Sequence, residues 1–106
     1  MTTSNSPNNI REKGIYYLCD EINMNTARDC ATWIMDSNLQ RNKKQDHLTL
    51  MITSYGGDLS AAFAIIDVMR GSSIPVHTVG LGCIASAGLL IFISGQKGKR
   101  IIKIGR

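Results

Sequence analysis

The stretch between Arg70 and Lys97 contains no Asp, Glu, Lys or Arg and is rich in apolar residues. An uncharged segment of this length has to be buried, either in a membrane or in a protein core. Its continuity is broken by one proline, one histidine and several glycines, among them Gly71, Gly80, Gly82 and Gly88 beside Pro75 and His77. Because such residues interrupt a membrane helix, we expect two buried elements joined by a turn, and no membrane partner.

The size and composition of the chain fit one small globular domain. It has 106 residues, of which 43% are apolar and 19% charged, enough for a modest core. Its cysteines, Cys19, Cys30 and Cys83, are odd in number and widely spaced, which predicts reduced thiols in a cytoplasmic protein rather than disulfides or a metal site. Residues 1–9 are polar and lack the apolar segment of a signal peptide, so we expect a flexible N-terminal lead-in.

The formal net charge of +4 is concentrated at one end of the chain. Residues 97–106 contain five basic side chains (Lys97, Lys99, Arg100, Lys103 and Arg106). No aromatic residue lies among them to stack on nucleic-acid bases, so we interpret this segment as a solvated basic strand and expect no nucleic-acid partner.

Short segments rich in β-formers alternate with segments of helical periodicity. The predicted strands are residues 14–19, 47–54, 75–80 and 100–104. The predicted helices are residues 26–39, 59–70 and 86–93. This alternation predicts an α/β fold with a mainly parallel sheet and flanking helices. The β-to-α turns then lie at the carboxyl ends of the strands, where sites in open α/β sheets form.

Local signals predict where the helices end and which faces they bury. Thr26 with Asp29 resembles a capping box, Asp58 suits an N-cap and Gly71 suits the C′ position. The apolar face expected for the first helix is Ala27, Cys30, Ala31, Ile34, Met35 and Leu39. The face expected for the second helix is Leu59, Ala62, Phe63, Ile66 and Met69.

Two turns carry residues that suit acyl transfer. Gly56 and Gly57 follow a predicted strand, and Ser86 stands where a turn becomes an apolar helix. Paired glycines allow a substrate to approach the backbone closely, and N–H groups at a helix start favour an anion. Backbone donors of this kind stabilise the oxyanion that develops in acyl transfer. The same residues are equally compatible with a tight turn and a helix cap that have no catalytic role.

A family resemblance favours the catalytic interpretation. The segments SYGGDLSAAFAIIDVMR and GLGCIASAGLLIFISGQKGKR combine a Gly-Gly turn, a helix, a strand, an Ala-Ser helix start and a GxKGKR segment. This pattern resembles ClpP, the proteolytic subunit of the ATP-dependent Clp proteases, and the interval from Gly57 to Ser86 matches without a gap. Upstream, IREKGIYYLCDEI is similar to the family's first strand, so the resemblance covers roughly residues 10–100.

The resemblance implies a serine endopeptidase subunit of a Clp-like ATP-dependent protease with a crotonase-like fold. Residues 10–106 would be the N-terminal part of its peptidase domain. Ser86 would be the nucleophile that forms the acyl-enzyme, and the backbone N–H groups of Gly57 and Ala87 would form the oxyanion hole. The implied partners are unfolded protein or peptide substrates, homo- or hetero-oligomeric ring subunits and an ATP-dependent unfoldase. Neither a cofactor nor a metal ion is implied.

The departures from the family pattern concern the general base. The family pairs its serine with a downstream histidine that an aspartate orients, and both positions lie beyond Arg106. His47 and His77 lie upstream of Ser86 and are expected to be structural. The alternative function is therefore a truncated, catalytically silent ClpP-like subunit that modulates rings of complete subunits.

Two other chemistries of the same fold superfamily match the residues less well. A crotonase-like acyl-CoA enzyme needs carboxylates at the turns, and the residues beside Ser86 offer none. A membrane-associated peptidase with a serine–lysine dyad needs a lysine in the site, whereas the lysines of residues 97–103 belong to the basic terminal stretch. Cys83 lacks a nearby base and is expected to be a buried thiol.

Overall fold

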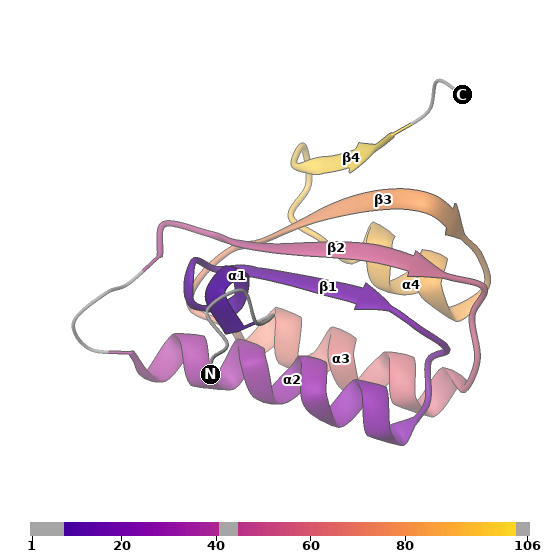
Figure 1. Ribbon diagram of the computed structural model, residues 1–106, viewed down its shortest axis with the longest axis horizontal. Helices are drawn as coiled ribbons and strands as arrows, with labels where there is room; N and C mark the ends of the chain where they lie inside the picture. The colour runs from indigo at the N-terminus through magenta and orange to yellow at the C-terminus, as the bar shows by residue number, and fades with distance from the viewer. Residues whose placement is uncertain (1–7, 41–44, 104–106) are drawn as a thin grey trace, which may run out of the picture.

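The computed structural model describes residues 8–40 and 45–103, in which helices and strands alternate (Figure 1). The strands are β1 (Ile15–Cys19), β2 (Leu48–Ser54), β3 (Val76–Ile84) and β4 (Arg100–Ile102). The helices are α1 (Asn8–Glu12), α2 (Met24–Leu39), α3 (Leu59–Gly71) and α4 (Ala87–Ile93). Every predicted element is present, and α1 is a short helix that the sequence patterns did not indicate. Residues 1–7 of the predicted lead-in, Ile104 of the predicted last strand and residues 41–44 lie outside the described residues.

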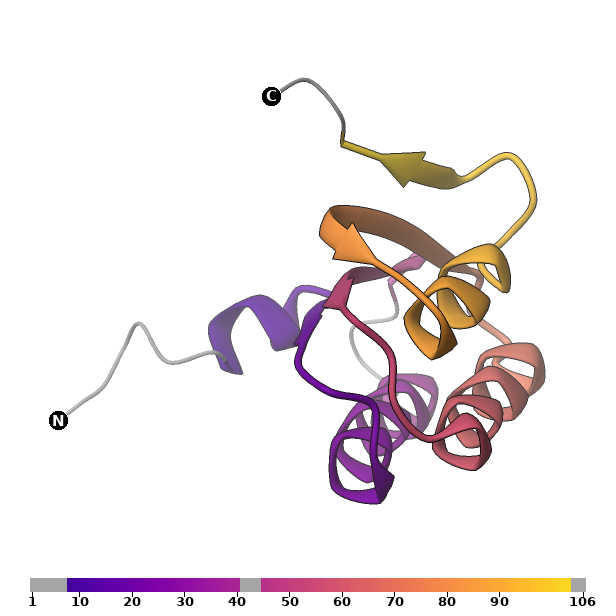
Figure 2. The same ribbon diagram turned by 90° about the vertical axis from the view of Figure 1, so that its right-hand side faces the viewer.

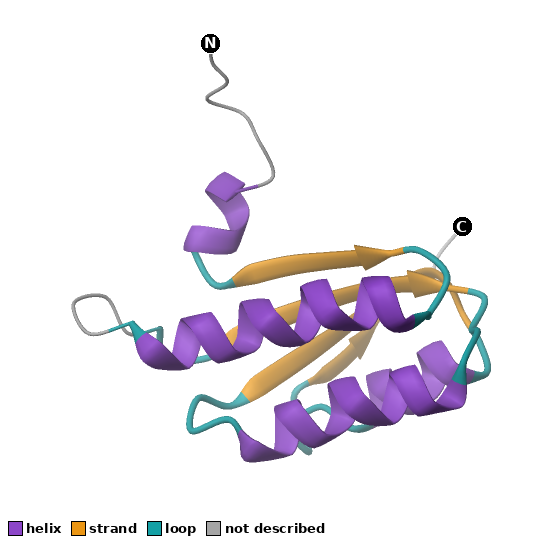
Figure 3. Cartoon of the chain, turned by 90° about the horizontal axis from the view of Figure 1, so that it is seen from below, coloured by secondary structure: helices purple, strands orange, loops and turns teal. Residues whose placement is uncertain are grey.

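All four strands form one parallel sheet in the order β1-β2-β3-β4. The helices α2, α3 and α4 lie on the same side of this sheet, with α2 and α3 next to each other (Figures 1 and 3). The three β-to-α turns meet at the carboxyl edge of the sheet, which faces the viewer in Figure 2. The predicted α/β class with a parallel sheet and flanking helices is confirmed. None of the described helices is both long and apolar enough to cross a membrane.

The central strand β2 shows how the sequence builds the core. Leu48, Leu50 and Ile52 are fully buried, while the intervening side chains lie on the opposite face and are half-buried. Full burial of an aliphatic side chain of this size contributes about 1.5–3 kcal/mol. The strand therefore fixes one apolar face of the sheet against the helices.

The start of α2 differs from the prediction. The helix begins at Met24, and its N-cap is Asn23 rather than Thr26. The Asn23 side chain accepts a hydrogen bond from the Thr26 N–H (2.9 Å), and the Thr26 hydroxyl accepts one from the Asn23 N–H (2.9 Å). A capping box is present, but Thr26 is its third helical residue and Asp29 is not part of it. The Thr26 assignment was wrong because Asn23 lies within reach of the same helix end and asparagine is the stronger cap.

The buried face of α2 agrees with the predicted one over most of its length and differs at its end. The predicted residues that are buried are Ala27, Cys30, Ala31 and Ile34. Met35 is half-exposed and Leu39 is 74% exposed, whereas Trp33, which lay beside the predicted stripe, is buried. The Trp33 ring centroid lies 5.2 Å from that of Tyr16 in β1, and its indole N–H donates to the Arg11 carbonyl (3.1 Å). This large side chain turns the helix toward β1 and leaves the predicted end of the stripe in solvent.

The buried face of α3 is rotated from the predicted one. Leu59 and Phe63, predicted to be in the core, are about half-exposed, at 50% and 51%. Ala61 and Ile65 are fully buried in their place. The predicted helical period was correct, but a period does not specify which side of the helix packs against the sheet.

Two element ends also differ from the prediction. Gly71 is the last residue of α3 rather than its C′ residue, and Ser72 caps the helix in an extended conformation. β3 continues to Ile84 instead of ending at Gly80. A register shift against β2 and the positive φ of Gly82 (65°) bend the strand and carry it onward.

The capping arrangement of α2 predicts which substitution destabilises the protein. Asn23→Ala is expected to lower the free energy of unfolding by about 1 kcal/mol, because the first turn of α2 loses a side-chain acceptor. Asp29→Ala removes an exposed side chain outside the box and is expected to change it by less than about 0.5 kcal/mol. Urea unfolding followed by circular dichroism measures both. A larger loss in Asp29→Ala than in Asn23→Ala would contradict the cap.

Candidate functional site

Ser86 lies in the turn between β3 and α4 in a backbone conformation that residues with side chains rarely adopt. Its φ is 53° and its ψ is −122°, and no other non-glycine residue in the described part of the chain has a positive φ. Such a conformation costs about 1–3 kcal/mol and persists only where the surroundings hold it. The residue is exposed, and its hydroxyl makes no capping bond to α4. The turn therefore leaves the Ser86 hydroxyl available at the carboxyl edge of the sheet.

The Gly-Gly turn between β2 and α3 follows a path that favours glycine. The φ angles of Gly56 and Gly57 are 118° and 145°. A methyl group on Gly57 would overlap the carbonyl oxygen of Ile22, which pairs with the turn. The Ile22 N–H donates to the Gly56 carbonyl (2.9 Å), and the Asp58 N–H donates to the Ile22 carbonyl (2.8 Å). The loop after β1 thus holds one side of the turn.

The two turns are in contact with each other. A methyl group on Gly56 would lie 2.8 Å from the Ser86 Cβ and 3.2 Å from its Oγ, so Ser86 packs directly against the glycine backbone. The Ala85 N–H donates to the Ser54 carbonyl (3.0 Å), and the Gly56 N–H donates to the Ser54 hydroxyl (3.1 Å). Ser54 is buried at the end of β2. It therefore ties both turns to the central strand.

Sequence reasoning missed the two residues that hold the site together, Ser54 and Ile22. A signal for Ser54 exists, because a serine two residues before a glycine suits a side-chain bond to the turn backbone. Ile22 is apolar and follows two acidic residues, a pattern that predicts a buried side chain but not the residue with which its backbone pairs. Its pairing with Gly57 depends on the three-dimensional path of the loop after β1.

Gly57 and Ala87 each keep a backbone N–H that no other group in residues 8–40 and 45–103 accepts. Both neighbours of Gly57 have their N–H groups engaged, Gly56 with Ser54 and Asp58 with Ile22. Ala87 is the first residue of α4, where a helix has no internal partner for the N–H. Gly57 follows Gly56 in the chain and Ala87 follows Ser86, and Gly56 and Ser86 are in contact. Backbone groups capable of binding an anion therefore lie along both turns.

His47 and His77 lie at the other end of the sheet. Their rings stack, with centroids 3.9 Å apart, where β2 and β3 begin. Between His77 and Ile84, at the end of β3, the strand rises by about 20 Å. Neither imidazole reaches the Ser86 hydroxyl, and the described part of the chain contains no other histidine. The geometry agrees with the structural role expected for both.

The cysteines offer no competing nucleophile with a base. All three are free thiols: Cys19 is exposed, Cys30 is buried and Cys83 is partly exposed. Burial raises the pKa of the Cys30 thiol to about 12, which keeps it neutral. Cys83 is less buried than predicted, because it lies on the face of β3 whose side chains, such as Val79 and Leu81, are only partly buried. The described residues contain no group of three or more His, Cys, Asp or Glu side chains that could hold a metal ion.

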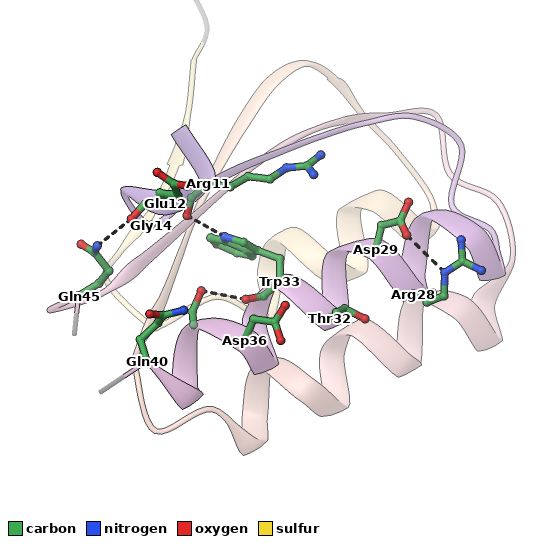
Figure 4. A pocket seen from close by; sticks show the side chains of 11 residues that line it. Arg11, Glu12, Gly14, Arg28, Asp29, Thr32, Trp33, Asp36, Gln40 and Gln45 are labelled. Carbon is green, nitrogen blue, oxygen red and sulfur yellow. Dashed lines mark hydrogen bonds and ion pairs between the residues drawn. The ribbon is translucent and has the colours of Figure 1, made fainter. Parts of the chain in front are cut away.

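Of two hollows in the described part of the chain, only the smaller adjoins the Gly-Gly turn. The larger, of about 780 Å³, lies between α1 and α2 beside Trp33 and includes no residue of the two turns (Figure 4). The smaller, of about 470 Å³, is lined by residues 19–21 and 53–57. Gly56 and Gly57 therefore line it, whereas Ser86 does not.

The sequence matches the family model described as Clp protease over residues 2–104. The chain belongs to the Clp protease family. This Clp protease family member is 35% identical over 96 residues to the ATP-dependent Clp protease proteolytic subunit 2 of Bifidobacterium longum, a match that covers 90% of this chain and 45% of that protein. The predicted resemblance to this family is confirmed, and the parallel sheet with its helices is a fragment of the ClpP-type fold.

Two further relatives match shorter parts of the chain. The ATP-dependent Clp protease proteolytic subunit of Streptococcus mutans is 35% identical over 88 residues, which are 83% of this chain and 44% of that protein. The ATP-dependent Clp protease proteolytic subunit 2 of Treponema pallidum is 44% identical over 48 residues, which are 45% of this chain and 24% of that protein. This Clp protease family member thus spans less than half the length of these curated relatives.

The close contact at Gly57 predicts opposite outcomes for two glycine-to-alanine changes. Gly57→Ala is expected to lower the free energy of unfolding by about 2 kcal/mol or more, because its methyl group meets the Ile22 backbone at a positive φ. Gly71→Ala is the matched control, since its position in α3 has nothing within 4 Å. That change is expected to raise the free energy of unfolding by about 0.5–1 kcal/mol. Equal effects in urea unfolding would contradict the packing of the Gly-Gly turn.

The stacked histidines predict a pH dependence of stability. Burial, the neighbouring His47 and then Lys99 lower the pKa of His77, while a hydrogen bond to the Gln96 side chain raises it by less. Because the unfolded chain binds this proton more readily, stability is lost as the pH falls through the ordinary histidine pKa of about 6.5. NMR titration is expected to show His77 below its usual range and His47→Gln to shift it upward. A His77 pKa above the usual range would contradict the arrangement.

Proposed function

We propose that this Clp protease family member is a serine endopeptidase subunit in which Ser86 attacks the peptide carbonyl. The observation that carries the proposal is the contact between Ser86, held at positive φ, and the backbone of Gly56. An exposed serine in a strained turn, beside a backbone that a peptide can approach closely, is suited to nucleophilic catalysis. The relatives, which are named proteolytic subunits of ATP-dependent Clp proteases, support the same reaction.

In the proposed site the N–H groups of Gly57 and Ala87 form the oxyanion hole. Both are without partners in the described residues and follow directly after Gly56 and Ser86, which touch. Negative charge builds on the carbonyl oxygen during attack, and one well-placed donor contributes about 3–4 kcal/mol to the transition state. The donors belong to the main chain and are fixed by Ser54 and Ile22, so little reorganisation is needed at the moment of reaction.

The reaction also needs an acceptor for the proton of Ser86. As Oγ bonds to the carbonyl carbon, this proton passes to the base, which returns it to the departing amine; water then hydrolyses the acyl-enzyme. Since His47 and His77 lie about 20 Å away along β3, we assign the base to a histidine outside the described residues. The family pattern supplies such a histidine, and an aspartate to orient it, downstream of Arg106.

The proposed substrates are unfolded proteins or peptides, and the proposed setting is a ring of homo- or hetero-oligomeric subunits that an ATP-dependent unfoldase supplies. A site made of two turns at the edge of a sheet can bind an extended chain through its backbone. The relatives are named proteolytic subunits of ATP-dependent proteases, which supports a separate ATPase partner.

One observation favours a second function. Neither described histidine can reach Ser86, so a chain without an added base would keep the fold and lose the chemistry. In that case the protein is a catalytically silent ClpP-like subunit that modulates rings of complete subunits.

Labelling with a fluorophosphonate tests the proposed nucleophile. The full-length product of the coding sequence, with whatever follows Arg106, is incubated with the probe and digested. An Oγ–P bond is expected to replace the P–F bond at Ser86, which mass spectrometry locates. Ser86→Ala is expected to abolish the label. Ser37→Ala is the matched control, since its hydroxyl only donates to the Trp33 carbonyl within α2, and it is expected to label fully.

The outcomes separate the two functions. A full-length product whose Ser86 stays unlabelled argues against the endopeptidase. If that unlabelled product also co-purifies with complete Clp protease subunits and changes their peptidase rate, the silent subunit is supported. Labelling of Ser86 by itself rejects the silent subunit.

A further inference from the structure

The hydroxyl of Ser54 bonds to both polar groups of the Gly56 backbone. It accepts the Gly56 N–H (3.1 Å) and donates to the Gly56 carbonyl oxygen (3.5 Å). Ser54 is 3% exposed, so water has little access to these bonds. A glycine at a φ of 118° has few steric limits of its own, and side-chain bonds of this kind decide which way its peptide groups turn.

The orientation of Gly56 determines where the Gly57 N–H points. The Gly56 carbonyl and the Gly57 N–H belong to one peptide group, and the described part of the chain contains no cis peptide bond. In a trans peptide group the C=O and the N–H point in opposite directions. Because the Gly56 carbonyl accepts the Ile22 N–H (2.9 Å), the Gly57 N–H points away from the loop that contains Ile22. The bonds of Gly56 therefore set the direction of this donor.

Ser86 lies against the same glycine. A methyl group on Gly56 would meet the Ser86 Cβ at 2.8 Å and the Ala85 carbonyl oxygen at 3.2 Å, so a change in the path of Gly56 changes its contact with Ser86. The Ser54 carbonyl accepts the Ala85 N–H (3.0 Å), which places the residue before the proposed nucleophile. Ser54 thus acts on the Ser86 turn through its carbonyl and on the glycine turn through its hydroxyl. A substitution of its side chain removes only the hydroxyl bonds.

We propose that Ser54 is a positioning residue for peptide hydrolysis, whose hydroxyl orients the Gly57 N–H toward the oxygen of the reacting carbonyl. The proposal rests on the function proposed above, since it concerns the oxyanion hole of the same site. In this role the hydroxyl does not contact the substrate and acts through the backbone of Gly56. Its loss is expected to weaken the transition state, in which negative charge builds on that oxygen, more than the bound ground state.

Peptidase kinetics of three variants of the full-length product, measured with a fluorogenic peptide amide, test this role. Ser54→Ala removes the hydroxyl. Ser54→Cys replaces it with a thiol of similar shape that is only a weak acceptor, so the test does not depend on how well Ser54→Ala folds. Thr78→Val is the matched control, because Thr78 is also buried and its hydroxyl donates to the Phe92 carbonyl (2.8 Å) near the end of α4.

Both Ser54 variants are expected to lower kcat about tenfold or more while KM stays within about twofold, because a misplaced oxyanion donor is lost only in the transition state. A peptide boronate forms a tetrahedral adduct that resembles this state, and it is expected to bind both variants more weakly by a similar factor. Thr78→Val is expected to lower the urea midpoint, as the Ser54 variants do, and to keep the wild-type kcat.

The outcomes distinguish this inference from the function on which it rests. A wild-type kcat in both Ser54 variants, or a fall no larger than that in Thr78→Val, overturns the positioning role and leaves the nucleophile intact. A loss that lies in KM alone also overturns it, since the hydroxyl then affects substrate binding. If the wild-type protein takes no fluorophosphonate label at Ser86, the proposed function fails and this inference fails with it.

Discussion

Ser54 is the residue on which the arrangement of the two turns depends. Its hydroxyl accepts the Gly56 N–H and its carbonyl accepts the Ala85 N–H, so a single buried residue at the end of β2 bonds to both. A methyl group on Gly88 would lie 3.2 Å from the Ser54 Cβ, which shows how closely α4 approaches the same point. Because Ser54 belongs to the central strand, the sheet itself sets the distance between the glycine turn and Ser86.

The secondary structure could be predicted from the sequence wherever one period dominated. The alternation of Leu48, Leu50 and Ile52 gave β2 correctly, and the helical spacing gave α3. Errors arose where a local signal had a competitor or where tertiary packing decided. Asn23 took the cap assigned to Thr26, and the sheet met α3 at an angle that leaves Phe63 half in solvent. Periodicity defines a face but not the direction from which a partner arrives.

The candidate site was only partly predictable, for a related reason. Gly56, Gly57 and Ser86 stand out as residue types that suit strained or closely approached backbone. The contact between the glycine turn and Ser86 depends on the register shift that pairs Ser54 with Ile84, and no local sequence pattern predicts such a shift. The family resemblance linked the two turns instead, because a family pattern relates residues that are far apart in the chain. It could not identify Ser54, which bonds through its hydroxyl and its carbonyl, or Ile22, which bonds through its main chain.

No group in the described residues accepts the backbone N–H of Gly57 or Ala87. This has a consequence for the selectivity of the proposed site. Main-chain groups bind what every peptide possesses, so the proposed chemistry is indifferent to the sequence of the chain being cut. Any preference among peptides has to come from side chains that line the approach to the two turns. Such side chains can change by substitution while the backbone of the turns, held by Ser54 and the glycines, stays as it is.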